Sequence, residues 1–98
     1  PTSLPGVVTI TSKRFEDARG FFSETFVTDK LAAQGVDFRC VQDNHVLSRE
    51  PYTLRGIHYQ LAPFAQSKLV RVVRGSALDV AIDVRRGSPT FGRFVTVT

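Results

Sequence analysis

The stretch LDVAIDV, residues 78–84, decides the fold class, because large aliphatic residues occupy every second position along it. One face would carry Leu78, Val80, Ile82 and Val84, and the opposite face Asp79, Ala81 and Asp83. A period of two is the period of a β-strand, in which successive side chains point to opposite sides of the sheet. The stretch therefore predicts a strand with one apolar face and one mixed face.

The same period recurs along most of the chain. It predicts strands over residues 7–15, 20–27, 38–47, 53–61, 68–75, 76–86 and 91–98, separated by glycine, proline, asparagine and aspartate. One helix is expected, Asp29–Gln34, with Thr28 as its N-cap and Gly35 just past its end. Short strands at this spacing are typical of a β-sandwich or barrel, so we predict an all-β fold with one short helix.

Length and composition indicate a single globular domain, residues 1–98, with a marginal core. Hydrophobic residues make up 42% of the chain and charged residues 22%, which is ordinary for a folded protein. No apolar run reaches membrane-spanning length, and the N-terminal residues lack the basic-then-apolar order of a signal peptide. We therefore expect a soluble, cytoplasmic protein that does not engage a membrane.

The last strand and the only cysteine each raise an expectation. Residues 94–98, FVTVT, still alternate where the sequence stops, so this strand either pairs with an earlier one or has partners outside the chain. We expect the second, a barrel that lacks its C-terminal strands. Cys40 has no disulfide partner and no neighbour at metal-ligand spacing, which favours a small buried apolar role.

The charge balance favours an anionic partner. The net charge is +4, and ten of the thirteen basic residues are arginine, whose planar fork suits bidentate contacts to phosphate or carboxylate. A mildly basic, solvated surface is the alternative explanation.

An arginine and a histidine flank a glycine in TLRGIHYQ, residues 53–60. Strict alternation would place Arg55 and His58 on opposite faces of the strand. A bulge at Gly56 would bring both to the same side, since strand glycines often mark a bulge or a close ligand approach. The alternative is that Arg55 points to solvent and His58 is a hydrogen-bonded core histidine.

Lys68 opens the next predicted strand. A neutral histidine, a lysine and an arginine on neighbouring strands would suit proton removal beside a carbonyl: His58 as base, Lys68 opposite the developing enolate, and Arg55 on a phosphate. An exposed lysine at a strand end is the alternative.

Asp79 and Asp83 would lie about 13 Å apart along one strand, too far for an acid–base pair. Surface roles, or contacts to Arg71 and Arg85, are expected for these two carboxylates.

Metal and nucleic-acid binding are both poorly supported. The only histidines, His45 and His58, do not form a His-x-His pair, so no metal site is expected. Arg19-Gly20-Phe21 matches the start of an RNA-binding strand motif, but Phe22 and the residues after it break the match. We therefore expect no nucleic-acid partner.

Four segments taken together carry a family resemblance: DARGFFSETF, FRCVQDNHVLS, TLRGIHYQ and AQSKLVRVVRGSALDVAIDVRRGSPTFG. Their order and spacing, over residues 8–98, resemble the dTDP-4-dehydrorhamnose 3,5-epimerase family of cupin-like sugar-nucleotide enzymes. The resemblance implies a jelly-roll barrel, a homodimer, no metal and no organic cofactor. It also implies epimerisation at C3 and C5 of a dTDP-4-keto-6-deoxyhexose through enolate intermediates, in deoxysugar biosynthesis of the dTDP-L-rhamnose type.

The resemblance assigns roles to particular positions. His58 resembles the general base and Lys68 the residue that stabilises the enolate oxygen. Positions that resemble contacts to the nucleotide, diphosphate or sugar are Arg19, Phe22, Glu24, Gln42, Asn44 and Arg55, the first three reaching the partner's site in the family dimer. The polar strand TLRGIHYQ would then line a barrel interior wide enough to hold a sugar.

The resemblance also marks a departure. The family's general-acid tyrosine and the aspartate that orients its base histidine both lie beyond the last residue of this sequence, and Tyr52 and Tyr59 do not stand at that tyrosine's place. The 98 residues alone would therefore be inactive. Three other functions stay open: epimerisation at only one carbon, ketoisomerisation on the same scaffold, and a non-catalytic module that binds a nucleotide sugar.

Overall fold

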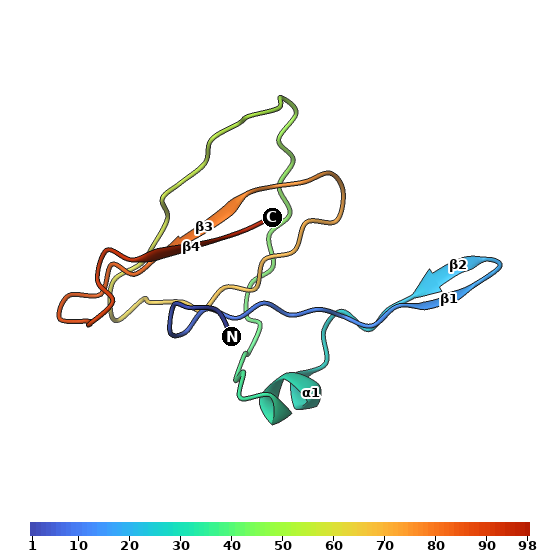
Figure 1. Ribbon diagram of the computed structural model, residues 1–98, viewed down its shortest axis with the longest axis horizontal. Coiled ribbons are helices and arrows are strands. Elements are labelled where there is room, and N and C mark those ends of the chain that lie inside the picture. Colours follow the sequence, from blue (N-terminus) through green and yellow to red (C-terminus); the bar gives the residue numbers. More distant parts are fainter. The chain divides into compact units, whose positions relative to one another are not determined.

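Two antiparallel hairpins and one short helix make up the regular structure of the chain (Figure 1). The computed structural model describes all 98 residues, Pro1–Thr98. In chain order the elements are β1 (Phe15–Asp17), β2 (Gly20–Phe22), α1 (Thr28–Ala33), β3 (Asp79–Ile82) and β4 (Phe94–Val97). Strands β1 and β2 form one two-stranded sheet, and β3 and β4 form another. These sheets do not close a barrel.

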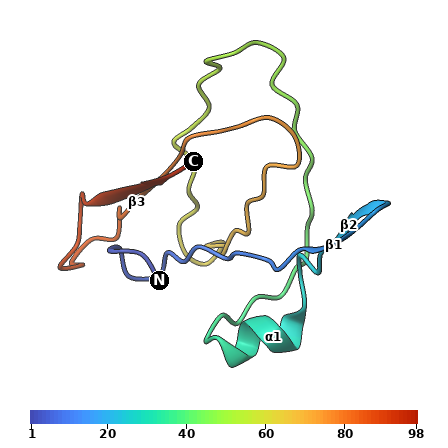
Figure 2. The same ribbon diagram turned by 45° about the vertical axis from the view of Figure 1, so that its right-hand side comes forward.

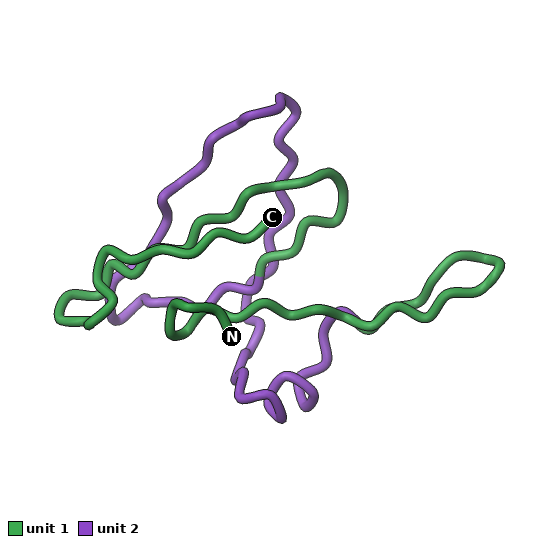
Figure 3. Tube along the Cα trace, in the orientation of Figure 1, with its two compact units in different colours: residues 1–24, 70–98 green, residues 25–69 purple.

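The chain divides into two compact units (Figure 3). Unit 1 comprises Pro1–Glu24 and Val70–Thr98 and contains both hairpins. Unit 2 comprises Thr25–Leu69 and contains α1 followed by a long segment without strands.

The β1–β2 hairpin turns at the segment that the sequence predicts as a turn, EDARG. Asp17 pairs with Gly20, so Ala18 and Arg19 form a two-residue loop. Two features stabilise it. The Asp17 Oδ1 accepts a hydrogen bond from the Arg19 backbone N–H at 2.8 Å. Gly20 has a φ of +132°, a backbone conformation that glycine adopts readily and residues with a Cβ disfavour.

The β3–β4 hairpin lies within the predicted strands 76–86 and 91–98 (Figures 1 and 2). Its register runs from Asp79 opposite Val97 to Ile82 opposite Phe94. Two further backbone hydrogen bonds continue the pairing, from the Asp83 N–H to the Arg93 carbonyl at 2.9 Å and from the Gly92 N–H to the Asp83 carbonyl at 2.8 Å. The last strand therefore pairs with an earlier one along one of its edges, and the expected lack of further C-terminal strands stays a prediction.

Four predicted strands carry little or no sheet. Residues 38–47, 53–61 and 68–75 contain no strand, and of residues 7–15 only Phe15 belongs to one. The alternation of apolar and polar residues indicates which residues suit each face of a sheet. A strand also needs a hydrogen-bonded neighbouring strand, which can come from a distant part of the sequence. The bulge predicted at Gly56 is likewise wrong, because no ladder surrounds it, although its φ of +115° is one that glycine favours.

Helix α1 confirms the predicted helix and its stop signal. Its N-cap is Val27, without a side-chain hydrogen bond, so the prediction of Thr28 as N-cap was wrong. Its C-terminus is a Schellman motif: the Gly35 N–H donates to the Ala32 carbonyl and the Val36 N–H to the Leu31 carbonyl, both at 2.9 Å. Gly35 adopts the left-handed conformation that this motif requires, with a φ of +78°.

Little of the apolar surface is buried. Leu4 and Leu31 are the only buried apolar residues, and no side chain is fully enclosed. The accessible area is 9455 Å², whereas a compact monomer of this mass would expose about 5,600 Å². Cys40 is exposed, which corrects the expectation that it is buried. No helix has the length and apolar character needed to span a bilayer.

Candidate functional site

The eight residues predicted to act on a substrate fall into two sets. Unit 1 carries Arg19, Phe22 and Glu24 on and just after the β1–β2 hairpin. Unit 2 carries Gln42, Asn44, Arg55, His58 and Lys68. The structure therefore groups them by unit, and each set is considered within its own unit.

Arg19 is held at the tip of the β1–β2 hairpin by Asp17. The Arg19 Nη2 donates to the Asp17 Oδ2 at 2.6 Å, and the Nε donates to Oδ1 and Oδ2 at 3.3 and 3.2 Å. This contact raises the pKa of Arg19 and lowers the pKa of Asp17. Both side chains are exposed, so the ion pair orients the guanidinium while leaving it open to solvent.

Aromatic rings lie along the two strands of this hairpin. The rings of Phe15 and Phe22 face each other across the two strands with centroids 6.4 Å apart, and the Arg14 guanidinium lies 4.6 Å from the centroid of Phe21. All three rings are at least half exposed. The hairpin residues line a hollow of about 360 Å³. Exposed aromatic rings beside an oriented arginine could stack on a nucleobase or sugar while the guanidinium binds an anion.

Gln42 and Asn44 interact with each other in unit 2. The Gln42 Nε2 donates to the Asn44 Oδ1 at 3.1 Å, and both side chains are exposed. This contact leaves the Gln42 carbonyl oxygen and the Asn44 amide N–H groups available, so the pair offers both acceptors and donors to a ligand.

Arg55 is oriented by two neutral acceptors across a short loop. Its Nε donates to the Ser48 Oγ at 3.0 Å, and its Nη2 makes a long contact of 3.5 Å to the Leu47 carbonyl. Neutral acceptors direct the guanidinium without cancelling its charge. The sequence does not point to Ser48, because nothing in a local pattern links it to an arginine seven positions later.

His58 and Lys68 are both exposed. In this 98-residue chain His58 is therefore not a buried core histidine. Neither residue lines the hollow at the β1–β2 hairpin or the one formed by Pro5 and residues 85–90, and the stretch 53–69 that carries them contains no strand. Their backbone is therefore not part of a sheet that would hold the two side chains next to each other.

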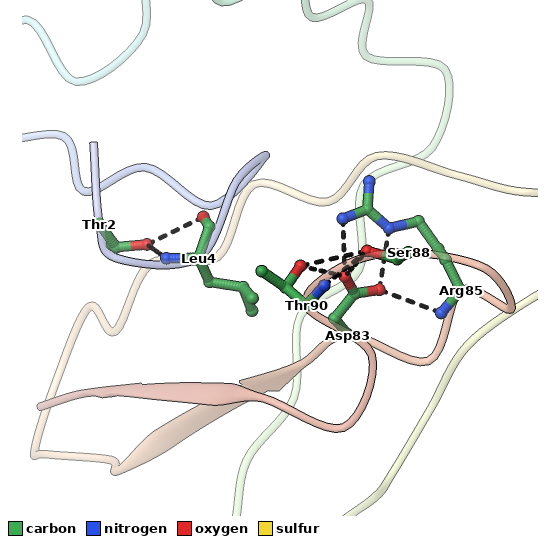
Figure 4. Close-up of polar contacts among 6 residues, drawn as sticks. All are labelled: Thr2, Leu4, Asp83, Arg85, Ser88 and Thr90. Carbon is green, nitrogen blue, oxygen red and sulfur yellow. Dashed lines mark hydrogen bonds and ion pairs between the residues drawn. The ribbon is translucent and has the colours of Figure 1, made fainter.

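Asp83 lies at the centre of a second polar cluster in unit 1 (Figure 4). Its Oδ2 accepts hydrogen bonds from the Ser88 and Thr90 hydroxyls, each at 2.6 Å, and from the Arg85 Nη2 at 2.9 Å. Its Oδ1 accepts from the Arg85 Nε at 2.9 Å. These bonds, led by the one from Arg85, hold the pKa of Asp83 well below its usual range. The expected contact to Arg85 is confirmed, but the expected surface position of Asp83 is wrong, since its residue is only 4% exposed.

The cluster shapes the loop after β3. Pro5 and residues 85–90 line a hollow of about 440 Å³, so the N-terminal turn lies against this loop. Leu4 in that turn is 3% exposed, and its backbone N–H bonds to the Thr2 hydroxyl (Figure 4). No buried side-chain N or O atom of the cluster lacks a hydrogen-bond partner, which is typical of a structural element rather than of a binding site. No group of three or more His, Cys, Asp or Glu side chains is arranged to hold a metal ion.

Comparison with known proteins places this chain in a family. The family model for dTDP-4-dehydrorhamnose 3,5-epimerase matches residues 1–98. Relatives named dTDP-4-dehydrorhamnose 3,5-epimerase are 49% identical over 94 residues in Sinorhizobium fredii and 50% identical over 99 residues in Shigella flexneri. A relative from Streptomyces niveus, named dTDP-4-dehydrorhamnose 3-epimerase, is 40% identical over 93 residues.

The alignments cover 96%, 98% and 94% of this chain, but 48%, 53% and 44% of those three relatives. The chain thus spans about half the length of the curated relatives it matches. The match along the whole chain shows that it belongs to the dTDP-4-dehydrorhamnose 3,5-epimerase family.

Proposed function

We propose that this chain provides the base-bearing half of an epimerase that acts on a dTDP-4-keto-6-deoxyhexose at C3, C5 or both, in deoxysugar biosynthesis of the dTDP-L-rhamnose type. The observation that carries the proposal is the family match over residues 1–98, joined to relatives of that name at up to 50% identity. The proposed site residues lie within the matched range.

In the proposed mechanism His58 removes the proton from a carbon next to the C4 ketone. The neutral imidazole of a histidine can accept that proton. The C–H electron pair moves into the ring as an enolate, and Lys68 stabilises the negative oxygen. Return of a proton to the opposite face of the carbon completes the inversion. The acid for this step would come from the half of the family's length that this chain does not span.

Substrate binding would use the two sets of polar residues described above. We assign the diphosphate to the guanidinium groups of Arg19 and Arg55, because both are exposed and oriented by hydrogen bonds. Phe22 offers an exposed ring for stacking, and Glu24 is assigned to the same nucleotide-binding set. Gln42 and Asn44 supply acceptors and donors for the nucleotide and diphosphate.

The proposed architecture is a cupin-like jelly roll to which residues 1–98 contribute one portion, as a single domain, in a cytoplasmic homodimer. The exposed apolar surface supports this, because the chain leaves far more area open than a compact protein of its mass. The proposal uses no metal or organic cofactor, since proton transfer and charge stabilisation by side chains account for the chemistry.

Hydrogen exchange at the substrate tests the catalytic assignment. The full-length protein is expected to incorporate solvent deuterium into a dTDP-4-keto-6-deoxyhexose, and His58→Ala to slow incorporation by at least roughly 10²-fold while keeping dTDP binding. His45→Ala is the matched control, since it removes the other exposed histidine. Undiminished exchange in His58→Ala would remove His58 from the base role.

The same assay separates the alternatives. Deuterium at C3 alone would match the activity named for the Streptomyces niveus relative. Binding of dTDP with no exchange at either carbon would identify a non-catalytic nucleotide-sugar module and reject the epimerase.

A further inference from the structure

We propose that Ser48 is a positioning residue for the substrate diphosphate, and that it acts by holding the Arg55 guanidinium toward the ligand. This inference rests on the proposed function, because it takes a nucleoside diphosphate as the ligand of Arg55. The contact that carries it is the 3.0 Å hydrogen bond from the Arg55 Nε to the Ser48 Oγ.

The loop between the two residues brings them together. It turns at Pro51–Tyr52, where Tyr52 has a φ of +61°, and the Thr53 hydroxyl donates to the Glu50 carbonyl at 2.7 Å inside the turn. The Ser48–Arg55 bond closes the loop at its base. The loop therefore contains two side-chain hydroxyl groups that form hydrogen bonds, and only that of Ser48 bonds to the arginine.

The Ser48 bond occupies one edge of the guanidinium and leaves others open. A guanidinium has five N–H donors in a fixed plane, and the Nε–H and one Nη2–H point to Ser48 and Leu47. The Nη1 donors and the second Nη2 donor stay available, and two of them can form the parallel pair that recognises phosphate oxygens. Fixing the plane in advance lowers the conformational entropy lost when the anion binds.

Arg19 and Arg55 differ in the charge of the groups that accept their hydrogen bonds. Arg19 is paired with the Asp17 carboxylate, whose charge offsets its own, whereas both acceptors of Arg55 are neutral. An anion that approaches Arg55 therefore does not compete with a carboxylate already bound to the same group. For this reason we assign Arg55, held by Ser48, a larger share of diphosphate binding than Arg19.

Calorimetric titration of the full-length protein with dTDP and with thymidine tests the proposal. Ser48→Ala is expected to weaken dTDP binding about two- to tenfold, the range for loss of one hydrogen bond, and to leave thymidine binding unchanged. Ser48→Thr keeps a hydroxyl and should restore most of the affinity. In steady-state assays, the loss in kcat/KM should come mainly from a higher KM.

Thr53→Ala is the matched control, because it removes the other hydroxyl bond of the same loop without touching Arg55. If Ser48→Ala acted only by loosening the loop, Thr53→Ala would weaken dTDP binding as much. An Arg55→Gln background supplies the second check, since the effect of Ser48→Ala should disappear when the arginine is absent.

The outcomes separate the inference from the proposed function. If the unmodified protein binds dTDP and Ser48→Ala binds it equally well, the role of Ser48 is rejected and the epimerase proposal stands. Equal losses for dTDP and thymidine, or for Ser48→Ala and Thr53→Ala, also reject it. Failure of the unmodified protein to bind dTDP would overturn both proposals.

Discussion

At the scale of single residues, the chain uses one arrangement twice with different consequences. In Asp17–Arg19 and in Asp83–Arg85, an aspartate accepts hydrogen bonds from the backbone N–H and the guanidinium of the arginine two positions later. The Asp17 side chain is 53% exposed, whereas that of Asp83 is 1% exposed and receives two further hydroxyl bonds. The first pair orients an exposed arginine, and the second fixes a loop.

This difference predicts opposite responses to the same substitution. Asp83→Asn in the full-length protein should lower Tm by several degrees, roughly 5 °C, because it weakens a buried acceptor of several hydrogen bonds. Asp17→Asn should change Tm little, since exposed ion pairs contribute little to stability. Thermal unfolding at pH 7 measures both. Equal shifts in the two variants would contradict the structural role given to Asp83.

The stability contribution of Asp83 should also depend on pH. Its folded pKa lies below the unfolded value of 3.8, so its contribution is fully present above that value and is lost as pH falls through the folded pKa. The Tm gap between the unmodified protein and Asp83→Asn should therefore be constant near neutral pH and narrow below about pH 4. Thermal scans from pH 7 to pH 3 measure this, and a gap that widens in acid would contradict it.

At the scale of elements, helix α1 is defined more clearly at its end than at its start. The Schellman motif at Gly35 satisfies two carbonyls, whereas Val27 provides no side-chain cap. A Cβ added at Gly35 would meet nothing within 4 Å. The effect of a substitution on stability should therefore come from the backbone conformation and not from a steric clash.

Gly35→Ala should therefore destabilise the full-length protein by about 1 kcal/mol, the cost of placing an L-residue in the left-handed region. Gly35→Asn should cost less, since asparagine tolerates that region and also occurs at this helix position. Denaturant unfolding of the two variants measures the difference in the free energy of unfolding. A cost for Asn that equals or exceeds that for Ala would point to something other than backbone conformation.

At the scale of the whole molecule, the exposed apolar area is the main feature. The 98 residues expose 9455 Å², about 1.7 times the area of a compact monomer of that mass. Many large apolar side chains that the alternating pattern would place in a core are open, among them Val41, Leu47, Leu54 and Leu61. Unburied area of this extent does not support a cooperative fold.

The 98-residue chain by itself should therefore bind the dye ANS and unfold without a sharp transition. Joining it to the second half of a family relative should abolish dye binding and produce a cooperative transition, because the apolar faces would then have partners. Dye fluorescence and thermal scans of the two proteins make the comparison. A sharp transition and no dye binding for the 98 residues alone would contradict this.

The sequence by itself determined the features that neighbouring residues control. These features depend on side chains a few positions apart, and the structure contains each of them. They are the turn at Asp17–Gly20, the end of the helix at Gly35 and the extended segments that form β3 and β4. The ordered motifs likewise identified the family. Local patterns can carry this information because turn and cap preferences are local energies.

Only the tertiary structure decided which segments pair and which polar groups are buried. The alternating pattern of LDVAIDV predicts Leu78 inside and Asp83 outside, yet Leu78 is 66% exposed and Asp83 4%. Asp83 is buried because Arg85, Ser88 and Thr90 satisfy its oxygens, a set that forms only when the loop folds back on the strand. Similarly, the orientation of Arg55 depends on Ser48 across a loop. Burial at Asp83 and the orientation of Arg55 depend on how a folded loop places hydroxyl and guanidinium groups in space, and an alternating pattern does not specify that placement.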